Sequence, residues 1–155
     1  MTDYHLPPTL AAIEASIDGW LAGFAAASPK FEAIDRGDPS ETAEPRWYVR
    51  LAGEEKEHIT VWLTLGQRTL RYEVYVMPFP PEHTAEVWET ALRRNQRLVG
   101  AHFAIGDEDA LYLRGELPLG ALNEAELDRI IGSLYAYVEQ SFPMLVRLGF
   151  ASRFS

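Results

Sequence analysis

Three consecutive segments alternate between apolar and other residues, and this alternation limits the possible folds more than any other feature of the chain. The segments are RWYVRLA at 46–52, ITVWLTL at 59–65 and TLRYEVYVM at 69–77. Alternation with period two is typical of a strand that buries one face. The linkers GEEKEH and GQR are short, so the three strands should pair antiparallel as a meander.

Three further segments carry apolar residues at helical spacing, namely 9–26, about 81–99 and about 124–147. Thr9 and Asn123 stand where an N-cap is expected. Gly100 should stop the second helix. Pro143 should kink the last helix or end it early.

The remaining segments complete a predicted order of α-βββ-α-ββ-α. AHFAI and ALYLRG read as two more strands, joined by residues 106–109. The stretch 28–45 is polar and punctuated by proline, which predicts a long loop, and residues 1–8 read as a tail. We therefore expect one α+β domain over 1–155, in which helices pack on an antiparallel sheet.

Composition narrows the function classes. The chain contains no cysteine, which excludes disulfides, cysteine nucleophiles and thiolate metal sites. No signal peptide is apparent and no apolar run approaches the length of a membrane span, so we expect a cytoplasmic protein with no membrane partner. The formal net charge of -9 repels nucleic acid at long range and favours a partner with a basic segment.

The motifs that usually carry chemistry are missing. Asp107, Glu108 and Asp109 lie between two predicted strands and lack the spacing of a calcium loop, so they read as a turn. The histidines are scattered, no glycine-rich phosphate loop occurs, and no serine-hydrolase motif occurs. We expect a protein without enzymatic activity, without a metal site and without a cofactor. The histidines are His5, His58, His83 and His102.

Arg93, Arg94 and Arg97 lie near the end of the second predicted helix, where the backbone dipole already favours cations. The phosphate-binding end of a helix is the opposite one. These arginines therefore read as a solvated face, and direct nucleic acid contact is not expected.

One face of the predicted meander is the first candidate binding surface. Tyr48, Trp62, Tyr75 and Met77 share it with arginine and threonine. Aromatic residues and methionine mixed with arginine are typical of protein interfaces. Two alternatives stay open: a helix covers this face, or these are ordinary strand residues.

The second predicted helix is the candidate dimer interface, because its apolar stripe contains a polar residue. A polar residue in an apolar seam can set the register between partner helices. The alternative is an asparagine that is satisfied inside its own core. The candidate seam consists of Val87, Trp88, Ala91, Leu92 and Asn95.

The chain resembles the YbjN-type domains and, in fold, the type III secretion chaperones. The resemblance covers residues 10–150. It is carried by WYVRLAGEEKEHITVWLTLG, LRYEVYVMPFPPEHTAEVWETALRRNQRLVGAHFAIGDEDALYLRGELPL and ELDRIIGSLYAYVEQSF. It implies the element order given above, a homodimer joined partly through the second helix, and binding of protein segments instead of catalysis. YbjN-type proteins are linked to regulation and stress responses.

We therefore expect a homodimeric, chaperone-like module that escorts or regulates an unidentified protein client. The alternative is a regulator that acts at nucleic acid, either directly through the three arginines or by binding a basic nucleic-acid-binding protein.

Overall fold

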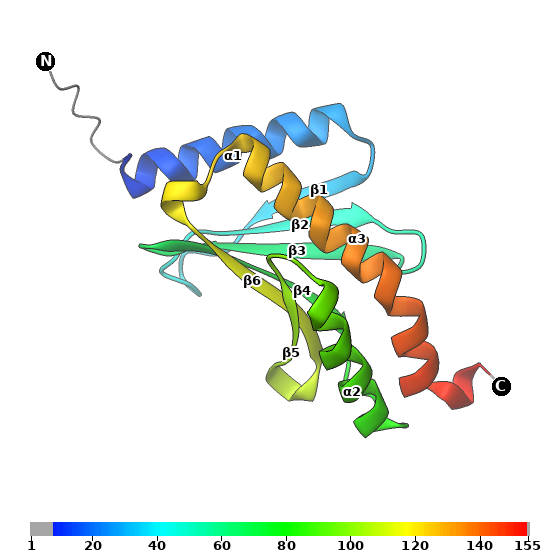
Figure 1. Cartoon of the computed structure of the whole chain (residues 1–155). Helices are drawn as coiled ribbons and strands as arrows, with labels where there is room; N and C mark the ends of the chain where they lie inside the picture. The colour runs from blue at the N-terminus through cyan, green and yellow to red at the C-terminus, as the bar shows by residue number, and fades with distance from the viewer. Residues whose placement is uncertain (1–7, 155) are drawn as a thin grey trace, which may run out of the picture.

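A computed structural model describes residues 8–154, and these form one antiparallel sheet with three helices (Figure 1). The six strands lie in the order β1-β2-β3-β4-β6-β5. The strands are β1 (Phe31–Arg36), β2 (Arg46–Ala52), β3 (His58–Leu65), β4 (Thr69–Met77), β5 (His102–Ile105) and β6 (Leu111–Pro118). The helices are α1 (Leu10–Ala27), α2 (Thr84–Arg94) and α3 (Glu124–Gly149). The α+β class with an antiparallel sheet is confirmed.

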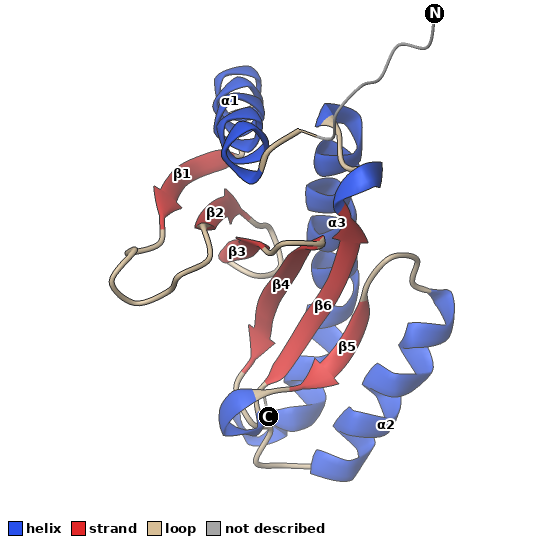
Figure 2. Ribbon diagram, turned by 90° about the vertical axis from the view of Figure 1, so that its left-hand side faces the viewer, coloured by secondary structure: helices blue, strands red, loops and turns tan. Residues whose placement is uncertain are grey.

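The predicted meander is present with the expected faces. Trp47 pairs with Leu63 and Tyr48 with Trp62 across β2 and β3. The alternating apolar residues of these strands are buried, whereas their neighbours in the sequence are mostly half-buried or exposed. Figure 2 shows β4, β6 and β5 in front of α3, so the helices cover one face of the sheet and leave the other without a helix.

The long loop predicted at 28–45 is wrong, because it contains the edge strand β1. β1 pairs antiparallel with β2 from Phe31↔Leu51 to Arg36↔Trp47. The register shifts between Phe31 and Ala33, so the strand lacks a regular alternation. Pairing with β2 stabilises a segment whose own pattern does not specify a strand. The predicted tail at 1–8 lies outside the described residues except for Pro8.

Helix α1 begins at the predicted cap, because the Thr9 hydroxyl accepts from the Ala12 amide at 3.1 Å. It packs on the sheet through Ile13, Ile17 and Leu21. Asp18 accepts a hydrogen bond of 2.7 Å from the Trp47 indole. This carboxylate therefore joins α1 to the buried aromatic residue of β2.

Within the described chain, α1 has the length and mean hydropathy (1.2) of a membrane-crossing helix. This corrects the expectation that no apolar run approaches that length. Signal sequences and the core helices of soluble proteins share this length and hydropathy. Residues of α1 also hold the domain together, since Glu14 and Asp18 both pair with Arg36.

Helix α2 is shorter than predicted. It starts at Thr84, after His83 in a left-handed conformation, and a 3₁₀ turn at Asn95–Arg97 follows it. The residues before Thr84 are tied to the end of α3, where the Glu82 amide donates to the Gly149 carbonyl at 3.0 Å. The left-handed backbone of His83 interrupts the helical conformation, so the helix can begin only at Thr84.

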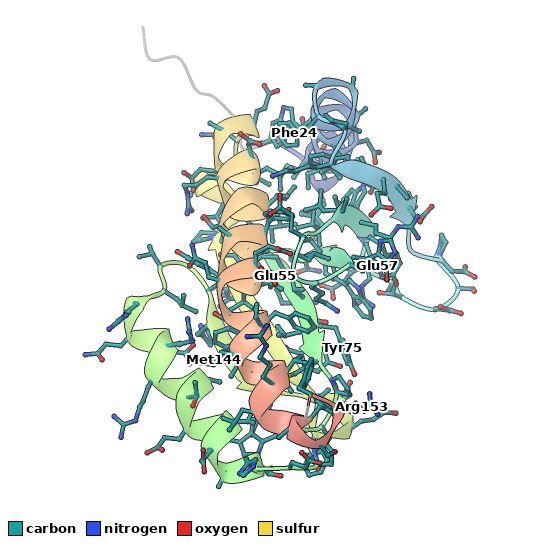
Figure 3. The ribbon with its side chains drawn as sticks, turned by 90° about the vertical axis from the view of Figure 1, so that its right-hand side faces the viewer. Phe24, Glu55, Glu57, Tyr75, Met144 and Arg153 are labelled. Carbon is teal, nitrogen blue, oxygen red and sulfur yellow. The ribbon has the colours of Figure 1, made fainter. Side chains whose placement is uncertain are left out.

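Helix α3 begins as predicted, with the Asn123 side chain accepting from the Glu126 amide at 2.8 Å. It continues through Pro143 to Gly149, so of the two alternatives for Pro143, a kink or an early end, the early end is wrong. Its Glu139 carboxylate accepts from the Glu54 and Glu55 amides at 3.1 and 2.8 Å. Glu55 lies beside α3 in Figure 3. The turn between β2 and β3 is thereby fixed to the helix layer.

Candidate functional site

The face of the sheet that no helix covers is the first candidate site, and we call it the open face. It is built by every second residue of four neighbouring strands, so its side chains follow directly from the register. Its central residues are Arg46, Tyr48, Trp62, Thr64, Arg71, Glu73, Tyr75, Tyr112, Arg114 and Glu116.

An edge-to-face aromatic pair lies on β2 and β3. The rings of Tyr48 and Trp62 are 5.2 Å apart at 87°. The Arg46 guanidinium lies 5.8 Å from the Trp62 ring, and its Nε donates to the Thr64 hydroxyl at 3.1 Å. The arginine is thus held in place while most of its donors remain available.

A second edge-to-face pair lies on β4 and β6, where the rings of Tyr75 and Tyr112 are 5.5 Å apart at 89°. Arg114 stacks 4.5 Å above the Tyr112 ring and donates to Glu73 at 2.8 Å. Burial raises the pKa of Tyr75 and of Tyr112 above their ordinary value. Both hydroxyls therefore stay protonated at neutral pH and can donate to a partner.

A cavity of about 460 Å³ lies on the open face, lined from β2, β3, β4, β5 and β6. Arg71 is paired with Glu44 at 2.5 Å and Arg114 with Glu73 at 2.8 Å. The lining thus combines arginine, carboxylate and an indole ring. It suits a mixed polar and aromatic partner better than a strongly charged one.

The structure places three of the four residues of the predicted binding face on the open face. Tyr48 and Trp62 are half-buried on the open face, and Tyr75 is 40% exposed there. The placement of Met77 is wrong, because its side chain is buried. A register shift between Tyr75 and Met77 inserts one extra residue into β4 and turns Met77 toward the helices.

The predicted dimer seam divides into two groups. Val87 and Ala91 are buried in the core of their own chain, so their assignment to a subunit interface is wrong. Trp88 is half-buried and Leu92 is 64% exposed. The Phe79 and Trp88 rings are 6.5 Å apart.

Asn95 is also used inside its own chain, which corrects its assignment to the seam. Its side-chain oxygen accepts from the Phe103 amide at 2.6 Å, and its side-chain nitrogen donates to the Phe103 carbonyl at 3.2 Å. The side chain thus forms the same pair of hydrogen bonds with the backbone of β5 that a residue of a neighbouring antiparallel strand would form. The alternative of an asparagine satisfied in its own core is correct.

Tyr112 was not predicted as a member of the binding face. The alternation in ALYLRG places its side chain on the face of the strand that Leu111 and Leu113 do not occupy. What the sequence lacked was the pairing of β6 with β4. The prediction that Arg94 belongs to a solvated face is wrong, since its side chain lies against Ser141 and Met144 of α3.

The predicted turn at residues 106–109 is confirmed. The Gly106 amide donates to the Ala110 carbonyl at 2.9 Å, and all three acids are exposed. No group of three histidine or acidic residues lies close enough to hold a metal ion within residues 8–154. His5 lies outside that range.

Comparison with known proteins places this architecture in a family. Residues 25–147 match the YbjN family, whose description reads "Putative bacterial sensory transduction regulator". Uncharacterized proteins of Mycobacterium bovis and Mycobacterium tuberculosis are each 36% identical over 110 residues, 71% of this chain. One from Mycobacterium leprae is 31% identical over 107 residues, 69% of this chain. The match spans about 60% of the length of these relatives. The chain belongs to the YbjN family.

Proposed function

We propose that this protein is a regulatory binding module that takes up an extended segment of a partner protein on its open face. The observation that carries the proposal is the pair of aromatic clusters, Tyr48–Trp62 and Tyr75–Tyr112, on a sheet face that no helix covers. Tyrosine and tryptophan are enriched where protein interfaces have their strongest contacts.

The arrangement supports recognition of a chain that carries apolar anchors and charges of both signs. The two aromatic clusters can each receive an apolar side chain. Between them, Arg71 and Arg114 are already paired with carboxylates, so little desolvation of unpaired charge accompanies docking. The net charge of -9 adds a preference for a partner that is basic overall.

A regulatory role agrees with the description of the family. We propose that the module works by binding alone. The acids of the open face support this, because Glu73 is tied to Arg114 and Glu116 accepts from Thr69 at 3.3 Å. Both carboxylates therefore have partners within the open face itself.

The test is site-directed photo-crosslinking in the native organism. A photoreactive residue replaces Trp62 or Tyr75, and the control carries it at Ala15, an exposed residue of α1. We expect the same protein to be captured from both open-face positions and not from Ala15. Trp62→Ser should reduce capture at position 75. If the two open-face positions yield no common partner, the proposal is wrong.

We further propose that two copies associate through the outward side of α2. Leu92, Trp88 and Phe79 form an apolar patch there, with Leu92 64% and Phe79 45% exposed. Glu89 and Arg93 pair at 3.1 Å beside it. A two-fold interface is self-complementary, so a contact between Glu89 of one copy and Arg93 of the other would occur twice.

A further inference from the structure

We propose that the groove between α2 and α3 binds a small phosphorylated ligand, held by Arg94 and Arg97. This inference goes beyond the proposed protein binding and does not depend on it. The groove measures about 540 Å³ and carries three arginines, with hydroxyls from Tyr137 and Ser141. Among the described residues that line it there is no aspartate or glutamate. Figure 3 shows Met144 on the side of α3 that faces α2.

Arg94 has hydrogen-bonding capacity that the protein leaves unused. Its Nε is the one buried side-chain nitrogen or oxygen without a partner in residues 8–154. Its terminal nitrogens reach only the Ser141 hydroxyl at 3.4 Å and the Met144 sulfur at 3.9 Å. A buried donor without a partner is destabilising, so the bonds within the protein do not account for the position of this guanidinium. Its terminal nitrogens make only these two long contacts and keep donors for a ligand in the groove.

The charges around the groove are also unbalanced. Arg93 at the edge of the groove is paired with Glu89, as Arg36 is with Asp18 and Arg114 with Glu73. Arg94 and Arg97 have none within 4.0 Å in the described chain. In a chain with 23 acidic residues, two neighbouring arginines without an acid leave an excess of positive charge. The arginine fork matches phosphate oxygens in a bidentate manner.

Neutral side chains define the rest of the ligand. The Tyr137 hydroxyl bonds both backbone groups of Val99, at 3.2 and 3.3 Å, so its position is held by the chain. Leu98 and Met144 provide an apolar part of the lining. A volume of this size fits a small molecule, and the combination suits a phosphate joined to a flat or apolar group, as in a nucleotide.

The net charge of the chain favours a small ligand over a nucleic acid. The net charge of -9 repels a long polyanion more strongly than a single phosphate group. The groove lies beside the C-terminal end of α2, where the helix dipole disfavours anions of either kind. The attraction therefore depends on the arginine side chains inside the groove.

The test measures binding of ATP, AMP and inorganic pyrophosphate to the full chain by calorimetry at constant ionic strength. We expect saturable binding at one site, weakened by about tenfold or more in Arg94→Gln and Arg97→Gln. The control is Arg68→Gln, which removes the same charge from the exposed turn between β3 and β4 and should leave binding unchanged. Absence of saturable binding to wild-type protein, or equal binding by all three variants, would overturn the proposal.

A second measurement separates a ligand role from a structural one. Without ligand, Arg94→Met should melt at the same temperature as wild type or higher, because the buried donor without a partner is gone. With ATP, wild type should gain thermal stability and Arg94→Met should not. A lower melting temperature together with an unchanged ATP response would assign Arg94 to the core. Affinity that rises with oligonucleotide length would assign the groove to nucleic acid, which would also overturn the proposal.

Discussion

At the scale of single residues, two side chains hold the edge strand β5 and the segment before it in place. Asn95 bonds both backbone groups of Phe103, and the Tyr72 hydroxyl donates to the Gly100 carbonyl at 2.6 Å. Both contacts hold the connection between α2 and β5 against the sheet. Side chains therefore replace backbone pairing at the edge formed by β5.

We expect Asn95→Ala to lower the free energy of unfolding by about 2 to 5 kcal/mol, because two partly buried backbone groups lose their partner. Urea unfolding at two protein concentrations measures this. Gln67→Ala, at an exposed turn residue, is the control and should change stability by less than about 0.5 kcal/mol. A cost for Asn95→Ala that appears only at low protein concentration would instead place Asn95 in the dimer interface.

Gly115 of β6 has no room for a larger residue. An added Cβ would collide with the Gly100 carbonyl oxygen and lie 2.5 Å from the Tyr72 ring. Gly115→Ala should destabilise the protein by about 2 to 3 kcal/mol through overpacking. Gly132→Ala is the matched control, because an added Cβ on α3 meets nothing within 4 Å. It should stabilise the protein by up to about 1 kcal/mol. Thermal unfolding measures the melting temperature of both variants. A shift of the two melting temperatures in the same direction would contradict this explanation.

At the scale of elements, the end of α3 depends on a contact with the segment before α2. The Glu82 carboxylate accepts from the Ser152 amide at 2.8 Å, and its own amide donates to Gly149 at 3.0 Å. The chain thereby connects the start of one helix with the turn that follows another. The acceptor in this contact is the Glu82 carboxylate, so protonation of that group at low pH weakens the contact.

Hydrogen bonds from Ser152 lower the pKa of Glu82 below its ordinary value. The folded state therefore binds the proton less tightly than the unfolded state. The stabilising effect is fully present above the unfolded pKa and is lost as the pH falls through the folded pKa. An NMR titration of the Ser152 amide from about pH 7 to pH 2 should show a transition below the usual glutamate range. In Glu82→Gln the transition should disappear; its persistence would assign it to another group.

At the scale of the whole molecule, the three helices lie on one face of the sheet, and two further surfaces stay exposed. One is the open face, and the other is the apolar patch of Phe79, Trp88 and Leu92 on α2. The two surfaces come from different elements. A dimer joined through α2 therefore leaves the residues of the open face to a partner.

Leu92→Glu should yield a folded monomer if α2 is the dimer interface, because the new charge would be buried between two copies. Sedimentation velocity measures the mass and circular dichroism the fold. Val99→Glu is the control, since Val99 is 70% exposed and lies outside the patch. It should leave the dimer intact. A wild-type protein that sediments as a monomer, or a Leu92→Glu dimer of unchanged mass, would remove α2 from the interface.

The sequence by itself determined the local features. Period-two alternation specified β2, β3 and β4 and the face that each strand buries. Thr9 and Asn123 specified where α1 and α3 begin. These features depend on residues within a few positions of each other, so they can be read along the chain.

Only the tertiary structure decided the rest, because the contacts involved join residues that are distant in sequence or depend on strand pairing. β1 needed β2 as a partner, and the extra residue in β4 turned Met77 toward the core. The half-buried Arg94 side chain lies against Ser141, 47 positions away in the sequence. The sheet face left open depended on where three helices packed, which no local pattern encodes.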